Sequence, residues 1–194
     1  MNGVIIINKP KGITSNAVIQ KVRKTLKTKQ VGHCGTLDPL ATGVLPILVG
    51  QGTKISKYLV EHDKTYIATI KLGEKTETAD SEGKTIEEKP VPILEEKHIT
   101  QVLESFLGKQ MQKPPIYSAI KKDGKKLYEY ARKGQSVEIE PRQIEIYKIK
   151  LLKFDKEDNT IMFKTTCSKG TYIRSLCEDI AEKLGTCRIY ERFN

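Results

Sequence analysis

One acidic side chain stands alone in the first third of the chain. Residues 1–60 contain nine lysines and arginines but a single carboxylate, Asp38. Asp38 lies in the glycine- and proline-rich segment 32–46, where Pro39 restricts the residue before it to extended geometry. Nearby cations favour an ionised carboxylate, and an ionised carboxylate is a nucleophile. The segment is compatible with a rigidly presented nucleophile, but its composition alone favours an Asp-Pro pair that only begins a turn.

Residue spacing gives less support to other chemistry. No second carboxylate or suitably spaced histidine accompanies Asp38, so we expect no metal site. The four cysteines form no Cys-x-x-Cys pair, which favours reduced thiols over a zinc site. Residues 50–54 read Gly-Gln-Gly-Thr-Lys and depart from G-x-x-x-x-G-K-[ST]. A phosphate-binding enzyme is therefore only a weak hypothesis, and no cofactor is expected.

The charge of the chain favours a polyanionic partner. The net charge is +10, and residues 1–60 contribute +8 of it (nine minus one). A field of this sign attracts nucleic acid, whereas a generally lysine-rich surface is the simpler explanation. No apolar run approaches the ~20 residues of a membrane span, and residues 4–7 are too short for a signal segment. We expect a cytoplasmic protein that binds no membrane.

Hydrophobic spacing predicts the elements that must position Asp38. A helix should begin at Thr14 or Ser15, which can cap it. Further helices are expected over the apolar stripes at 99–107, 127–131 and 173–184. Strands are expected at 4–7 (buried), 66–72, 144–154 and 160–167, with loops at 31–46 and 73–98. This irregular alternation predicts a single α+β domain over residues 1–194, with a mixed, mostly antiparallel central sheet flanked by helices.

Residues 32–46 closely resemble the catalytic motif of the TruB family of bacterial tRNA pseudouridine synthases. Further blocks resemble other family motifs, in the family's order, at residues 8–15, 64–66 with 72–73, 114–121, 124–134 and 167–176. The resemblance implies a pseudouridine-synthase-like fold with an RNA-gripping insertion at about 111–134. It also implies isomerisation of the T-loop uridine of tRNA, at position 55, without a cofactor.

The resemblance implies roles for five residues. Asp38 is the nucleophile, attacking either C6 of uracil or C1′ of ribose. Tyr66 stacks on the flipped base, and His33 contacts RNA beside it. Tyr172 and Arg174 line the pocket, with the guanidinium beside the nucleophile keeping it ionised and aimed. The base that removes the C5 proton is the same aspartate, the pocket tyrosine or water. On spacing alone, Tyr66 would be a core aromatic and Arg174 a surface side chain.

The insertion and the tail complete the prediction. Residues 111–134 carry seven basic side chains and three tyrosines, which suit phosphates and exposed bases. The tail, residues 186–194, matches the family poorly, and the family's C-terminal RNA-binding domain is expected to be absent, by natural shortening or truncation. We expect a monomer whose partner is the tRNA T stem-loop. The alternative is an RNA-binding or tRNA-folding module with vestigial catalysis.

Overall fold

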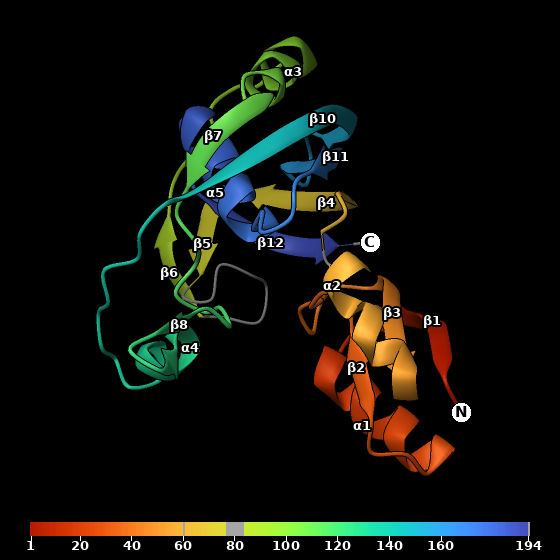
Figure 1. The fold of residues 1–194 in the computed structure, drawn as a ribbon. Helices are drawn as coiled ribbons and strands as arrows, with labels where there is room; N and C mark the ends of the chain where they lie inside the picture. Colours follow the sequence, from red (N-terminus) through yellow and green to blue (C-terminus); the bar gives the residue numbers. More distant parts are fainter. Residues whose placement is uncertain (60, 77–83, 194) are drawn as a thin grey trace. The chain divides into compact units, whose positions relative to one another are not determined.

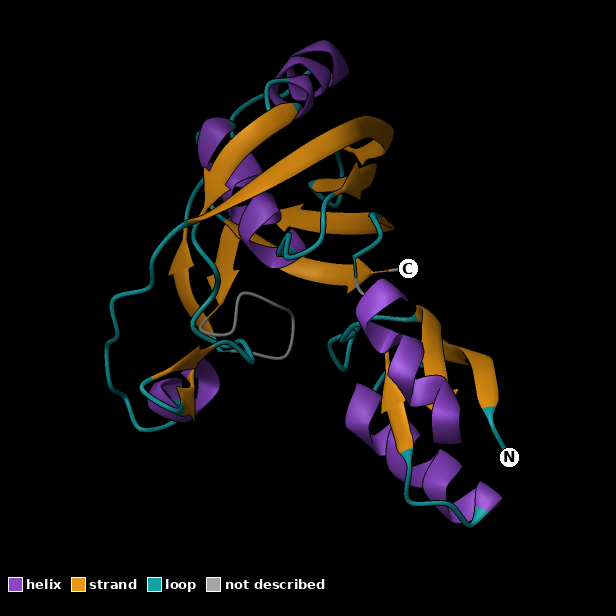
Figure 2. Cartoon of the chain, viewed as in Figure 1, coloured by secondary structure: helices purple, strands orange, loops and turns teal. Residues whose placement is uncertain are grey.

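The computed structural model describes residues 1–59, 61–76 and 84–193, with the backbone alone for 188–193. Helices and strands are interspersed along the described chain (Figure 2). Backbone contacts divide it into two compact units. The first is Met1–Tyr66 with Arg192–Asn194, and the second is Ile67–Glu191. The single domain expected over 1–194 stays a prediction. Within the described residues, no helix has the length and apolar character needed to cross a membrane.

The first unit packs a helix against a small antiparallel sheet (Figure 1). The strands lie in the order β1-β3-β2. As predicted, helix α1 begins after Thr14, whose hydroxyl accepts a hydrogen bond from the backbone amide of Ala17. The elements of this unit are β1 (Gly3–Lys9), α1 (Ser15–Leu26), β2 (Val31–His33), β3 (Gly43–Val49), the 3-10 turn η1 (Gly50–Ile55) and α2 (Ser56–Leu59).

The core of the first unit lies between α1 and one face of its sheet. Buried apolar side chains come from the helix and from all three strands, with those of β1 only partly buried. Residues 4–7 form a strand as predicted, but our prediction that this strand is buried is wrong, because the side chains of β1 alternate and Ile6 is 63% exposed. The loop predicted at 31–46 is also wrong at both ends, where β2 and β3 pair antiparallel.

The second unit is built on a five-stranded sheet in the order β12-β4-β11-β10-β7. Helices α3 and α5 contact each other, and α3 also packs on β10. Core side chains of the sheet and α5, such as Phe163 and Leu176, are completely buried. These elements are β4 (Lys64–Leu72), α3 (Glu96–Glu104), β7 (Gly108–Gln112), β10 (Arg142–Asp155), β11 (Thr160–Cys167), α5 (Ile173–Lys183) and β12 (Arg188–Phe193). The predicted mixed α+β class with a mostly antiparallel sheet is confirmed.

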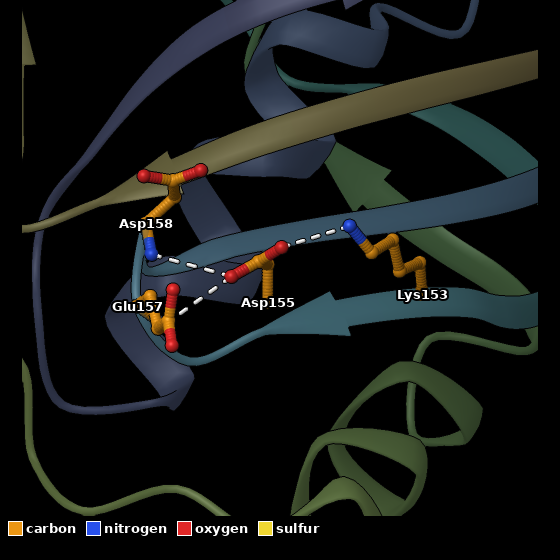
Figure 3. Close-up of polar contacts among 4 residues, drawn as sticks. All are labelled: Lys153, Asp155, Glu157 and Asp158. Carbon is orange, nitrogen blue, oxygen red and sulfur yellow. Dashed lines mark hydrogen bonds and ion pairs between the residues drawn. The ribbon is translucent and has the colours of Figure 1, made fainter.

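The Asp155 side chain organises the turn between β10 and β11 (Figure 3). The Asp155 carboxylate accepts hydrogen bonds from the backbone amides of Glu157 (3.2 Å) and Asp158 (3.3 Å). It also accepts one from the Lys153 ammonium at 2.8 Å. The Lys153 hydrogen bond, followed by these amide contacts, lowers the pKa of Asp155 below its ordinary value. These contacts hold together the polar turn that joins β10 to β11.

Two smaller hairpins lie outside the main sheet of the second unit. The predicted loop at 73–98 contains β5 (Glu74–Thr76) paired with β6 (Thr85–Glu88), and α3 begins at its end. The part of that prediction at 77–83 lies outside the described residues. The insertion contains β8 (Lys121–Lys122), β9 (Lys125–Lys126) and α4 (Leu127–Ala131). Its tight turn places Asp123 and Gly124 at positive φ, the conformation that two-residue hairpin loops require.

Candidate active site

Both neighbours of Asp38 are hydrogen-bonded to the segment that leads into α1. The buried Ser15 hydroxyl donates to the Leu37 carbonyl (3.0 Å) and accepts from the Leu37 amide (2.9 Å). On the other side, the Gly12 amide donates to the Pro39 carbonyl at 2.8 Å. Gly12 has a φ of +88°, which a side chain would strain. Asp38, itself half-buried, is thus held between two fixed residues, as a presented carboxylate requires.

Lys9 adds a buried cation to the same loop. Its side chain is completely inaccessible to solvent, and its ammonium donates to the carbonyls of Pro10 (2.9 Å), Ile13 (2.7 Å) and Pro39 (3.2 Å). Burial lowers the pKa of Lys9, and the negative charge of Asp38 opposes that shift. Lys9 therefore connects the end of β1, the turn before α1 and the Asp38 loop.

His33 and Tyr66 are the other predicted site residues of the first unit. His33 ends β2 and is half-buried. Its Nδ1 is shielded from solvent and, within the described part of the chain, has no hydrogen-bond partner. Tyr66 lies near the start of β4 and is half-buried. A tyrosine ring offers the flat π-face that stacking on a base needs.

Tyr172 and Arg174 lie where the second unit's sheet leads into α5. Tyr172 is the residue before the helix, and both its backbone amide and its carbonyl are hydrogen-bonded to the side chain of Gln112. Arg174, in the first turn, is 7% exposed, and its Nη2 donates to the Tyr117 carbonyl at 2.9 Å. The spacing-based reading of Arg174 as a surface side chain is therefore wrong.

The five predicted residues fall into two groups. Asp38, His33 and Tyr66 belong to the first compact unit, and Tyr172 and Arg174 belong to the second. The expected pairing of the guanidinium with the nucleophile joins residues of different units, and it stays a prediction.

The insertion gathers cations around an aromatic ring. The Lys126 ammonium and the Arg132 guanidinium each lie 5.4 Å from the centre of the Tyr128 ring. Leu127 is buried and holds α4 in place, whereas Lys121 and Lys125 are exposed at the hairpin. Exposed cations beside a half-buried ring can meet phosphates and bases together.

The described residues offer little support for metal or thiol chemistry. Across 1–59, 61–76 and 84–193, no group of three His, Cys, Asp or Glu side chains could hold a metal ion. The four cysteines are buried and form no disulfide in the described part of the chain. Burial raises the pKa of Cys34, with Lys64 acting in the opposite direction, so this thiol is not prepared as a nucleophile.

The family profile described as TruB family pseudouridylate synthase (N terminal domain) matches residues 23–173. The chain belongs to the TruB family. The match runs from α1 to the start of α5 and includes Asp38, His33, Tyr66 and Tyr172. Arg174 and the Lys9 segment lie just outside it, so their assignment depends on the motif resemblance.

Two curated relatives of this TruB-family chain carry the name tRNA pseudouridine synthase B. The protein of Hydrogenovibrio crunogenus is 48% identical over 186 residues, covering 96% of this chain and 61% of the relative. The protein of Bacillus subtilis is 52% identical over 189 residues, covering 95% of this chain and 61% of the relative. The chain thus spans about three fifths of the length of these relatives.

A solved structure supports the fold. The crystal structure of a Cbf5-Nop10-Gar1 complex contains a chain that matches with a TM-score of 0.75 and 29% identity. The match covers 98% of this TruB-family chain and 47% of the other. The predicted pseudouridine-synthase-like fold is therefore confirmed.

Sequence analysis missed two buried polar residues of this site. Lys9 was counted only among the basic residues of the segment 1–60, yet its ammonium donates hydrogen bonds to three backbone carbonyls. Gln112 was given no role, yet it binds the backbone of Tyr172. The Lys-Pro pair in the motif at residues 8–15 was a signal for the first; no sequence pattern indicated the second. Arg23 of α1 donates to the Val31 carbonyl at 3.2 Å.

Proposed function

We propose that this chain isomerises the T-loop uridine of tRNA, at position 55, to pseudouridine, with Asp38 as the nucleophile. The observation that carries the proposal is identity near 50% across 95% of the chain to proteins named tRNA pseudouridine synthase B. The doubly anchored Asp38 loop supports it, because nucleophilic attack requires a carboxylate held in one place. We further propose one catalytic domain, acting as a monomer in the cytoplasm.

The proposed reaction conserves the composition of the nucleoside and exchanges only a proton with the solvent. The target uridine leaves the RNA stack, and Tyr66 offers a surface for the extruded base. The Asp38 carboxylate attacks at C6 of uracil or at C1′ of ribose, and the bond between N1 and C1′ breaks. The base turns, and C5 joins C1′. The C5 proton passes to a base, N1 regains a proton, and the carboxylate is released. No redox equivalent, water or metal enters this balance.

We propose that Tyr172 and Arg174 complete the pocket. A guanidinium offers a fork of charged donors that matches a carboxylate, so Arg174 would bind the Asp38 carboxylate and aim it. The buried position of Arg174 makes such a role more effective, because a charge shielded from water acts more strongly on its neighbours.

The proposed RNA grip of the insertion should appear in the salt dependence of binding. Replacing the exposed Lys121 and Lys125 together with alanine removes two candidate phosphate contacts. The slope of log K against log salt concentration should then fall by about 2, with weaker binding to all tRNAs. Fluorescence titration of tRNA at several salt concentrations measures it. Lys97 and Lys156, both exposed outside the insertion, provide the matched double-alanine control. Equal slopes for the two double variants would show that the insertion does not contact the RNA phosphates.

Mapping pseudouridine tests the proposed function directly. Unmodified tRNA is incubated with the pure chain, and modified positions are located by chemical labelling and primer extension. We expect one new pseudouridine, at position 55 of the T-loop. Tight tRNA binding with no pseudouridine at any position would instead favour an RNA-binding or tRNA-folding module.

A further inference from the structure

A buried amide side chain holds the backbone of Tyr172 at two points. Gln112 ends β7 and is only 4% exposed. Its Nε2 donates to the Tyr172 carbonyl at 3.0 Å, and its Oε1 accepts from the Tyr172 amide at 2.8 Å. The two residues are 60 positions apart in the sequence. We infer that Gln112 is a positioning residue, which sets the Tyr172 and Arg174 side chains for the reaction; this inference rests on the proposed function.

The chemistry of the contact explains why a glutamine stands there. An amide is the side chain that offers a donor and an acceptor side by side, which matches the two polar groups of one backbone residue. Tyr172 is the residue before the first turn of α5; its carbonyl already accepts from the Leu176 amide at 3.0 Å, whereas its amide has no acceptor within the helix. Without Gln112, the Tyr172 amide would lose this acceptor and the carbonyl would lose one of its two donors, so the orientation of the backbone would be less sharply defined.

Two more hydrogen bonds extend the contact along both segments. The buried Ser175 hydroxyl donates to the Lys113 carbonyl at 3.0 Å. Arg174 donates to the Tyr117 carbonyl at 2.9 Å. Residues 112–117 are therefore bound side by side to residues 172–175, all within the second unit.

The position of this contact in the chain gives it a functional consequence. Residues 112–117 lead directly into the hairpin and helix of the basic insertion. RNA bound to the insertion therefore acts first on residues 112–117, the segment that Gln112 attaches to the Tyr172 backbone by hydrogen bonds. Gln112 therefore fixes the start of the insertion relative to the start of α5. RNA bound by the insertion then has a defined position relative to Tyr172 and Arg174.

Gln112→Met tests the inference, because methionine fills a similar volume but offers neither the amide donor nor the amide acceptor. At saturating tRNA, the single-turnover rate of pseudouridine formation per folded molecule should fall by about 10- to 100-fold, as expected for a displaced positioning group. The tRNA dissociation constant should change by less than about threefold, since no RNA contact is removed. Hydrogen exchange of the Tyr172 amide should accelerate by at least about tenfold.

Gln110→Met is the matched control. Gln110 lies on the same strand, two residues earlier, and its Nε2 donates to the Phe106 carbonyl at 2.8 Å, away from residues 172–175. It should retain the wild-type rate within about twofold. An unchanged rate or unchanged Tyr172 exchange in folded Gln112→Met would overturn the inference, as would a loss confined to tRNA affinity.

Two further arms keep the inference testable. If Gln112→Met does not fold, Ser175→Ala removes the neighbouring link, and the rate should fall by roughly fivefold. A wild-type rate for Ser175→Ala would then overturn the inference. If the wild-type chain makes no pseudouridine, the proposed function fails, whereas the exchange measurement still decides whether Gln112 fixes the Tyr172 backbone.

Discussion

Asp38→Asn should lower pseudouridine formation by roughly 10⁴-fold or more, the loss expected when a covalent nucleophile is removed. Asparagine has nearly the same shape as aspartate, but its neutral amide cannot attack uracil or ribose. The hydrogen bonds that fix Leu37 and Pro39 use backbone atoms and Ser15, so the loop should keep its form. Release of tritium from 5-tritiated uridine in tRNA measures the reaction.

The control for Asp38→Asn separates chemistry from folding and binding. Asp63→Asn changes an exposed aspartate of the same unit and should retain full activity. The tRNA affinity of Asp38→Asn should persist. Its stability should fall slightly, because the negative charge of Asp38 partly offsets the burial of the Lys9 ammonium. Turnover of Asp38→Asn at the wild-type rate would end the nucleophile assignment.

Sequence periodicity predicted the elements that bury a regular apolar face. Helix α5 places an apolar stripe, including Leu176 and Ile180, against the sheet, and its end is marked by Gly185 at positive φ. Strands β10 and β11 were expected for the same reason. In such elements, local spacing and tertiary burial agree, so the local signal suffices.

Elements that depend on distant partners escaped prediction. Strand β7 reads Gly-Lys-Gln-Met-Gln, which has no clear apolar alternation, and it is a strand because it pairs with β10, about 30 positions later. Strand β2 has three residues in a glycine-rich stretch, and β3 supplies its partner. Strand β1 was wrongly predicted to be buried because a run of isoleucines and valine does not show that one face of the strand is exposed.

The predicted site residues are those that lie in the recognised motifs. An isolated acid in a basic stretch drew attention to Asp38, and the motif resemblance assigned it as the nucleophile and supplied His33, Tyr66, Tyr172 and Arg174. The residues that hold these groups were not found. Their roles depend on backbone atoms brought close by folding, and composition or spacing contains no information about such contacts.

Lys9→Met is expected to cost about 2–4 kcal/mol in the free energy of unfolding, because buried carbonyls lose their donor. Three carbonyls accept from the Lys9 ammonium, and of these Pro39 keeps its bond from Gly12. The Pro39 carbonyl, directly after Asp38, should then keep only one of its two hydrogen bonds. The rate per folded molecule should fall by about 10²-fold, the effect of a small misplacement of a reacting group. Urea unfolding and single-turnover kinetics measure the two effects.

Lys11→Met is the matched control for Lys9→Met, because it removes the same charge from an exposed side chain two residues away. Its free energy of unfolding should change by less than about 0.5 kcal/mol. If the positive field of residues 1–60 were what mattered at Lys9, both variants would weaken tRNA binding alike and leave the unfolding midpoint unchanged. If the buried hydrogen bonds matter, only Lys9→Met loses stability and rate. The midpoint difference between two variants of equal charge therefore decides whether this lysine acts on RNA or on the loop that carries Asp38.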